Sequence, residues 1–420
     1  MKVGLISFFL LFAPFTAARI SDGFSIGLLD LMSFAFLALA LPRISSVAKT
    51  GLGFLLTLLI CTLTFSFLAG SIVNEFSARD LAFARMIFIM LPAILLISQP
   101  MSEEKVWRMT FLFFWGGFIA VLLGIVLHHL GIQIRSNQQA LWAGDGSGPS
   151  LRAGGVLGNS SDFGHLTAVW GSVCGLGVLV FGRRRSRFLV TLLIFAVSFY
   201  ATWIASSRAA TLHLLLAYGL ALPFLLGRTG WAMAGCATVF TLLSLPFLLS
   251  EFSLLLPQSV TYNLQRLDFL NISGNSTFLQ TGRFVNWIHL MAVFQENWFL
   301  GIGYKNINSD YGVWGDNSYL TILVEFGLLA GAVNILLWIW LIAISAASAL
   351  KNRRGVVFFA VVLSEAVHGL TVDTGTIWYS MPFAWLFITA HYLLQTQSGG
   401  LRNKRGAATA RNLYPATPYT

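Results

Sequence analysis

Charged side chains are scarce in this chain of 420 residues: Asp, Glu, Lys and Arg make up only 10% of it, whereas 56% is hydrophobic. A soluble domain needs more charge than this to cover its surface, so the scarcity excludes an ordinary water-soluble fold. Apolar stretches recur along the whole sequence, and a helix needs about 20 apolar residues to cross a bilayer core. The composition predicts an all-α polytopic membrane protein.

Motifs of nucleotide and metal chemistry are also missing. No Gly-rich loop opens a helix before a Lys to hold phosphates, and no dinucleotide-binding fingerprint occurs. The three cysteines all lie inside apolar stretches, which argues against a disulfide framework and favours simple packing. His128, His129 and His165 are scattered without the spacing of metal ligands. The sequence therefore predicts no cofactor and no metal.

Positive charge is in excess, with a formal net charge of +10. The Lys and Arg residues cluster in short turns between apolar stretches and near the C-terminus, which is typical of cytoplasmic loops and argues against nucleic acid as a partner. If the first helix is retained rather than cleaved as a signal peptide, every dense basic turn falls on one side. About twelve spans are expected, near 3–18, 24–41, 51–70, 80–98, 109–130, 163–181, 188–206, 209–227, 231–250, 319–347, 356–372 and 374–395.

This count places both termini in the cytoplasm and two long loops on the outer side of the membrane. Long loops in a compact protein usually carry function, so we expect the site there. The expected segments are N-terminal helices 1–130, outer loop 131–162, central helices 163–250, outer loop 251–318, C-terminal helices 319–395 and a disordered basic tail 396–420.

Arg208 breaks the basic-inside pattern, and Arg152 is another arginine on the predicted outer side. Arg208 follows the outer end of a predicted span, where it either anchors the helix end or pairs with an anion, and we favour the anion. Arg152 precedes a glycine-rich run, Gly154, Gly155 and Gly158, whose backbone amides can approach a ligand closely. Flexible linking explains that run equally well.

The second outer loop contains a predicted amphipathic helix over 284–299, because its apolar residues recur at helical spacing. Trp287 and Trp298 are expected to anchor this helix at the membrane–water interface. Arg283 falls in its first turn, where a cation gains nothing from the helix dipole. An anionic ligand would explain that placement.

Polar residues follow where the chain re-enters the membrane. Gly301 and Gly303 form a turn, and Asp316 and Asn317 then precede Tyr319 and the next span. The local spacing favours Asp316 as the N-cap of that span, a role that does not exclude catalysis.

Acidic residues in or near the spans are costly in a membrane and are therefore expected to face a polar interior. They are Asp30, Glu325, Glu365 and Asp373.

Taken in order, these clusters resemble the O-antigen ligase/polymerase superfamily of bacterial membrane glycosyltransferases. The resemblance covers most of the chain and is sharpest from about 150 to 335. It rests on the run from Arg152 to Asn159, Ser207-Arg208-Ala209, Arg283 with Trp287, Leu300-Gly301-Ile302-Gly303, and Asp316-Asn317-Ser318-Tyr319-Leu320 running into Glu325-Phe326-Gly327.

The resemblance implies a twelve-span fold of the GT-C type in the bacterial inner membrane, with its site on the periplasmic face. It implies a glycan donor linked to undecaprenyl pyrophosphate and an acceptor glycan, together with flippase and chain-length regulator proteins as partners. Arg208 and Arg283 would stabilise the diphosphate, and the lipid would lie along the helix over 284–299. Arg152, Asn317, Tyr319, Trp287, Gly301 and Gly303 would line the substrate site.

One departure bears on the activity. The ligases that this pattern resembles carry His-Asn where this chain has Asp316-Asn317. A carboxylate can also activate an acceptor hydroxyl as a general base, and we favour a polysaccharide polymerase. The alternatives are a ligase that uses another acceptor, such as lipid A-core, and a transporter of lipid-linked oligosaccharides. The lack of an internal repeat between the two halves weakens the transporter.

Overall fold

The computed structural model describes residues 2–12, 28–73, 83–132, 152–157, 159–182, 186–227, 230, 282–304, 306–312, 315, 317–372 and 380–413. All the regular secondary structure that these residues form is helical, and they form no strand. The elements are α1 (Lys2–Phe12), α2 (Leu28–Ala40), η2 (Leu41–Arg43), α3 (Ile44–Val47), α4 (Gly51–Val73), α5 (Phe83–Phe88), α6 (Leu91–Ile97), α7 (Glu103–His129), η5 (Gly155–Leu157), α8 (Ser160–Phe181), α9 (Arg187–Ile204), α10 (Arg208–Leu226), α14 (Gly282–Glu296), α15 (Asn306–Asp310), α16 (Ser318–Ala349), α17 (Arg353–Thr371) and α18 (Met381–Leu413).

Eight of the described helical segments are long and apolar enough to cross a membrane, which confirms the prediction of a polytopic helical membrane protein. The expected span over 80–98 is interrupted instead, because α5 ends at Phe88 and α6 begins three residues later at Leu91, with Pro92 in its first turn. The expected span over 231–250 lies outside the described residues.

The helix α18 continues past Gln395 to Leu413, into the segment where the sequence predicted a disordered tail. Its Leu, Arg, Lys and Ala residues are good helix formers, which explains the continuation.

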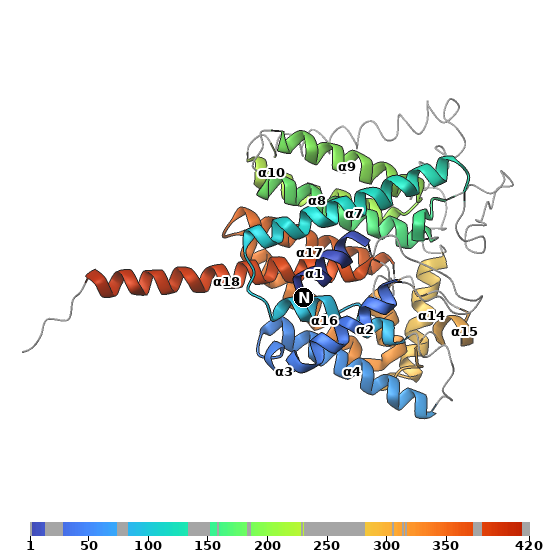
Figure 1. Ribbon diagram of the computed structural model, residues 1–420. Coiled ribbons are helices and arrows are strands. Elements are labelled where there is room, and N and C mark those ends of the chain that lie inside the picture. Colours follow the sequence, from blue (N-terminus) through green and yellow to red (C-terminus); the bar gives the residue numbers. More distant parts are fainter. Residues whose placement is uncertain are drawn as a thin grey trace, which may run out of the picture.

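The bundle has two ends that differ in chemistry, and we name them the loop end and the tail end. The loop end contains the last residue of α7, the first residues of α8, α10 and α16, and the helix α14 (Figure 1). The tail end contains the starts of α7 and α17, and α18 extends outward from it (Figure 1). Contacts between elements fix this arrangement: Gly70 near the end of α4 lies against Gly303, whereas Gly51 at its start lies against Trp340 and Tyr392.

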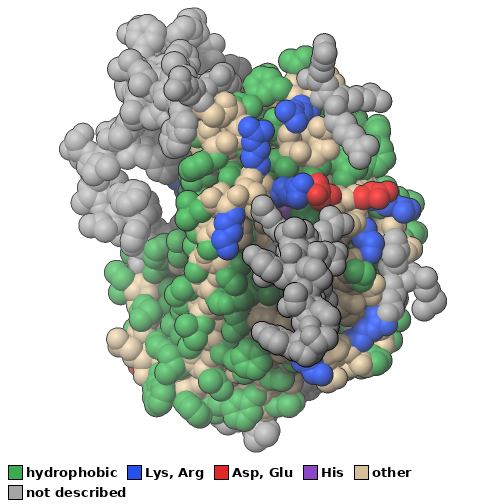
Figure 2. Space-filling model, turned by 90° about the vertical axis from the view of Figure 1, so that its left-hand side faces the viewer, with side chains coloured by type: hydrophobic (Ala, Val, Ile, Leu, Met, Phe, Trp, Pro, Cys, Tyr) green, Lys and Arg blue, Asp and Glu red, His purple; other side chains and the backbone are tan. Residues whose placement is uncertain are grey.

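Basic side chains are concentrated at the tail end. Figure 2 views this face directly, and Lys and Arg side chains are spread across it. The described residues of the short basic turns all belong here and are exposed or half-buried: Arg43, Lys49, Lys105, Arg108, Arg187, Lys351, Arg353 and Arg354. The turns that the sequence analysis grouped on one side of the membrane thus share one end of the bundle.

The helix α8 lies at the centre of the bundle, and 89% of its most apolar stretch is buried. Its glycines allow this enclosure, because a Cβ at Gly164, Gly171 or Gly175 would overlap Ser207, Ser198 or Tyr218 on neighbouring helices. Small residues that let helices approach closely are a main source of helix association in membranes. This packing brings α9 and α10 close to α8.

A charged pair holds α2 against α5. Arg85 donates two hydrogen bonds to Asp30, from Nε at 2.8 Å and from Nη2 at 3.1 Å. Bidentate pairing of this kind is the strongest geometry for an arginine and a carboxylate. Asp30, which the sequence analysis expected to face a polar interior, is buried.

The helix α16 is broken at Gly327, where φ is +74° and ψ is −176°. The turn that follows α14 packs into this break: Ile302 and Gly303 donate backbone hydrogen bonds to Val324 and Glu325, and Leu328 donates to Trp298. A Cβ at Gly327 would overlap the Phe299 carbonyl oxygen. The break therefore depends on a glycine at this position.

We expect Gly327→Ala to lower the free energy of unfolding by at least about 2 kcal/mol, since it adds a steric clash to a backbone region that is essentially restricted to glycine. Gly131→Ala is the control, because Gly131 has a φ of +68° but open space around it. Equilibrium unfolding of the detergent-solubilised protein measures both. Equal losses would mean that the contact with Phe299 contributes nothing.

Candidate functional site

The segment that precedes α8 docks onto the turn between α9 and α10. Arg152 donates a hydrogen bond from Nη2 to the Ser206 carbonyl oxygen at 2.6 Å, and Ala153 donates its backbone N–H to Ile204 at 3.0 Å. Ser206 has a φ of +50°, an uncommon conformation for a residue other than glycine. Arg152 is thereby bound to Ser206, which precedes Arg208 by two positions in the chain. The structure thus brings together two arginines that are distant in sequence.

Arg208 is the first residue of α10, and its side chain is exposed at the loop end. Arg283 is the second residue of α14, although its side chain lies outside the described part of the chain. Both arginines therefore open helices, where the partial positive charge of the helix dipole opposes a cation and favours an anion. The placement of Arg283 in a first turn, expected from the sequence, is confirmed.

The helix predicted over 284–299 is α14, which spans Gly282–Glu296. Leu290 and Val293 pack with Val324 of α16 in a small core that also includes Ile302 and Ile307. Other apolar residues of α14 and the turn after it remain exposed: Val285 (52%), Ile288 (71%), Met291 (41%), Trp298 (53%) and Phe299 (56%). One side of the helix is therefore anchored to α16, and another presents an apolar surface.

The N-cap of α16 is Asn317, whose side chain accepts hydrogen bonds from the backbone N–H groups of Tyr319 at 3.0 Å and Leu320 at 3.1 Å. The expectation that Asp316 caps this helix was therefore wrong by one residue. The helix begins at Ser318, and an N-cap must immediately precede the first helical residue to reach these donors. Asp316 itself lies outside the described residues.

The remaining predicted site residues have structural contacts. Tyr319 is half-buried and donates its hydroxyl to the Ala366 carbonyl oxygen at 2.9 Å. Gly301 and Gly303 have φ values of +76° and +94°, and a Cβ at Gly301 would overlap the backbone of Glu325. Trp287 is half-buried in α14. Gly301 therefore sits in the close backbone contact at the break in α16.

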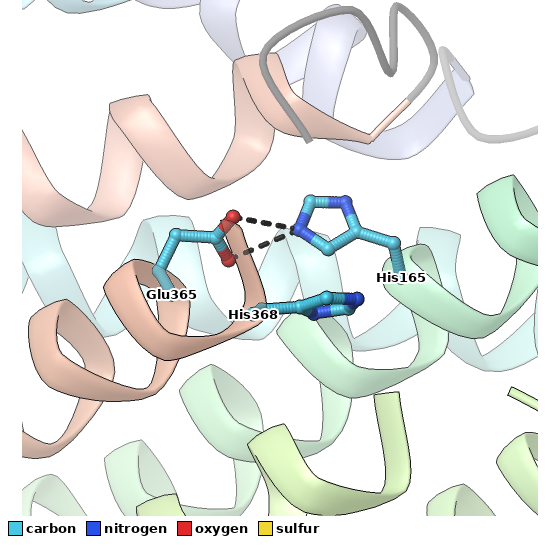
Figure 3. Close-up of side chains that lie close together, drawn as sticks. All are labelled: His165, Glu365 and His368. Carbon is cyan, nitrogen blue, oxygen red and sulfur yellow. Dashed lines mark hydrogen bonds and ion pairs between the residues drawn. The ribbon is translucent and has the colours of Figure 1, made fainter. Parts of the chain in front are cut away.

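A second group of polar residues, which we call the histidine cluster, lies buried beneath the loop end and consists of His165, His213, Glu365 and His368. His165 Nε2 lies 2.9 and 3.0 Å from the two carboxylate oxygens of Glu365, and His165 Nδ1 lies 2.6 Å from Ser380 Oγ (Figure 3). Both side chains of this pair are fully buried. Glu365 thus faces a polar interior, as the sequence predicted.

His213 joins the cluster from α10. Its Nδ1 lies 3.6 Å from Glu365 Oε2 and 3.4 Å from His368 Nδ1, and its Nε2 lies 3.2 Å from Ser172 Oγ. His165, Glu365 and His368 each offer a ligand atom, and these three atoms lie within 4.8 Å of one another. The arrangement has the donor set of a site for a transition metal.

The sequence analysis missed this cluster because its members come from α8, α10 and α17, and only the packing of these helices brings them together. One signal was available. Glu365 and His368 are three residues apart, so they share one face of a helix, which is a spacing found in metal-binding helical bundles. His165, which the sequence analysis described as scattered, belongs to the cluster.

The cluster lies close below the exposed arginine of α10. His213 follows Arg208 by five residues, which corresponds to about 7.5 Å along a helix. Gly164, next to His165, has Ser207 as its nearest neighbour. The loop end therefore combines the exposed Arg208 at the start of α10 with a buried cluster of three histidines and one glutamate.

Comparison with known proteins gives no relative: no protein-family model matches the chain, and no curated protein matches it.

We expect Glu365→Ala to lower the free energy of unfolding by about 3–5 kcal/mol, because it leaves the buried imidazoles without their carboxylate partner. The control is Glu103→Ala. Glu103 pairs with Arg354 at 2.6 Å, but its side chain is 52% exposed, and such surface pairs contribute about 1 kcal/mol or less. Equilibrium unfolding in detergent compares the two variants, and similar small losses would show that the cluster does not stabilise the bundle.

Proposed function

We propose that this chain is a membrane polysaccharide polymerase of GT-C type, with twelve spans and its site on the periplasmic face of the bacterial inner membrane. It would transfer a glycan from undecaprenyl pyrophosphate onto a lipid-linked acceptor glycan. Neither a nucleotide nor a metal is needed for this transfer, because the donor's diphosphate link supplies the energy.

The observation that carries the proposal is the arrangement of Arg152, Arg208 and Arg283. Arg152 is docked beside the turn that leads to Arg208, and Arg208 and Arg283 open helices at the same end of the bundle. This end lies opposite the face that holds the described basic turns (Figure 2). The positive-inside rule then assigns the arginines to the outer side, where a diphosphate would meet them.

The apolar surface of α14 fits the lipid part of such a donor. Ile288 is its most exposed apolar residue and lies five residues after Arg283, and Phe299 is exposed in the turn beyond the other end of the helix. A polyprenyl diphosphate has the matching chemistry, with an anionic head and a long hydrocarbon chain. The helix would also lie at the membrane interface, as amphipathic helices do.

In the proposed reaction, a hydroxyl of the acceptor glycan attacks the anomeric carbon of the donor. The bond between that carbon and the diphosphate oxygen breaks, and the lipid diphosphate leaves with the electron pair. Asp316 would accept the hydroxyl proton, and the arginines would stabilise the charge that develops on the leaving group. Asn317, Tyr319, Trp287, Gly301 and Gly303 would shape the pocket around these groups.

Two alternatives remain distinct from this proposal. A ligase would perform the same chemistry with another acceptor, such as lipid A-core. A transporter of lipid-linked oligosaccharides is favoured by one observation, the buried histidine cluster, because ionisable groups inside the membrane often serve proton-coupled movement.

We expect Arg208→Ala to lower transfer activity by about 10²–10³-fold, because it removes a cation from the leaving group. The chain-length distribution of the polysaccharide, measured in cells that carry only the variant, is the readout. Arg187→Ala is the matched control, since Arg187 is also an exposed arginine at the first residue of a helix but lies at the tail end.

The pattern of products separates the three functions. Single unpolymerised repeats in Arg208→Ala cells support a polymerase, and long lipid-linked chains that never reach their final acceptor point to a ligase. Repeats trapped on the cytoplasmic leaflet would reject both and favour transport. Unchanged chain lengths in Arg208→Ala, or an equal loss in Arg187→Ala, would reject the proposed diphosphate site.

The cap and the general base can be tested separately, because Asn317 makes the capping bonds. Asp316→Asn is expected to abolish transfer without changing the unfolding temperature, since the amide cannot accept the proton. Asn317→Ala is expected to lower the free energy of unfolding by about 1 kcal/mol. Transfer assays and thermal unfolding of both variants measure this, and full activity in Asp316→Asn would reject the general base.

A further inference from the structure

The histidine cluster contains more polar side chains than a single buried ion pair. Three imidazoles and one carboxylate, all at most 1% exposed, converge from three helices in the interior of the bundle. Placing polar groups there is costly unless each is paired or coordinates a metal. Two features of the cluster are not explained by pairing alone.

The first feature is the contact between two ring nitrogens. His213 Nδ1 and His368 Nδ1 face each other at 3.4 Å. At most one of two facing nitrogens can donate a hydrogen bond usefully, and 3.4 Å is long for such a bond. When an ion at about 2.0–2.1 Å from each nitrogen is tetrahedrally coordinated, however, two of its ligand atoms lie about 3.4 Å apart.

The second feature is His368 Nε2, which is buried and makes no hydrogen bond within the described part of the chain. A ring nitrogen without a partner in the protein interior has lost its hydrogen bonds to water without replacement, so its retention needs a reason. Because Nδ1 of the same ring faces His213, an ion bound at Nδ1 would not contact Nε2, and a metal site alone does not account for this nitrogen.

We propose that His165, Glu365 and His368, drawn in Figure 3, bind a zinc ion inside the helix bundle, and that His213, whose Nδ1 lies 3.4 Å from His368 Nδ1, is the fourth ligand. Imidazole nitrogens with one carboxylate are typical ligands of zinc, whereas magnesium and calcium prefer oxygen ligands throughout. The donor atoms of Glu365 lie 2.9 and 3.6 Å from those of His165 and His213, close to the edges of a small coordination polyhedron.

Two serine hydroxyl groups contact the histidine ligands, as the outer partners of zinc ligands commonly do. Ser380 Oγ lies 2.6 Å from His165 Nδ1, and Ser172 Oγ lies 3.2 Å from His213 Nε2. In both rings the nitrogen that does not face the cluster therefore has a hydrogen-bonding partner. Such outer partners fix the orientation of ligand histidines and raise their affinity for the metal.

The ion would join α8, α10 and α17 close beneath Arg208. With one carboxylate among its ligands, the zinc site would carry a net positive charge in the membrane interior. It would therefore hold the start of α10 in position and add to the positive potential of the loop end. This inference does not depend on the proposed transfer reaction, because metal binding is measured without any substrate.

The test measures metal in the full-length protein, purified in detergent through an affinity tag without histidine. We expect about one zinc per chain by mass spectrometry of the metal, after dialysis against a weak chelator. Replacement of zinc by Co²⁺ should give the visible absorption of a tetrahedral cobalt site. Removal of zinc with a strong chelator should lower the unfolding temperature of the protein.

Variants assign the ligands. His165→Ala, Glu365→Gln and His368→Ala should each bind less than about a tenth of the wild-type zinc, and Ser380→Ala should weaken zinc binding by about 10–100-fold. His391→Ala is the control, because His391 is equally buried at 1% exposure but packs against Phe181 and Phe358, away from the cluster. It should retain full zinc.

Wild-type protein that binds no stoichiometric zinc after incubation with Zn²⁺ would overturn the proposal and leave the cluster as a proton-carrying group. This result needs no variant, so it holds even where a variant fails to fold. Zinc that persists in folded Glu365→Gln and His368→Ala, or that is lost equally in His391→Ala, would also overturn it.

Discussion

The absence of water inside a membrane is the constraint on which this structure depends. A charged or hydrogen-bonding side chain within the bundle must find its partner inside the protein, because lipid offers none. Asp30 meets this requirement through two hydrogen bonds from Arg85, and Glu365 meets it through His165. Each pair joins helices that are far apart in sequence, so the need for partners also fixes which helices are neighbours.

The same constraint explains why glycine and serine are prominent at the centre of the bundle. The helix α8 is enclosed because its glycines let Ser198, Ser207 and Tyr218 approach its backbone. This close approach places α10, which carries His213, against α8, which carries His165, and the arrangement of the histidine cluster thus depends on small residues elsewhere on α8. The positions of the polar groups in this interior therefore depend on how closely the helices pack.

The basic turns and the candidate functional residues lie at opposite ends of the bundle. The tail end holds the described basic turns, exposed or half-buried as they would be at a membrane surface. The loop end holds Arg152 against the Ser206 carbonyl, with the histidine cluster close below. The break at Gly327 lets the turn after α14 pack into α16, so that α14 is held at this end as well.

Several features were predictable because they depend on neighbouring residues alone. The helical membrane class follows from composition, and α14 follows from its apolar spacing. The cap of α16 was misplaced by one residue, since Asp and Asn are both good caps and local sequence does not choose between adjacent ones. The break in α16 was missed, because Gly327 within an apolar run gives no sign of the turn that packs against it.

The sequence by itself determined that this protein is helical and membrane-embedded, because hydropathy acts over a single stretch of about 20 residues. It also separated the arginines into two groups, those in the short basic turns and those on the predicted outer side, such as Arg152 and Arg208. Only the tertiary structure placed Arg152 beside the turn before Arg208, and only it assembled His165, His213, Glu365 and His368. These contacts join residues 54 to 200 positions apart in the chain, and no local pattern records which distant helices will pack together.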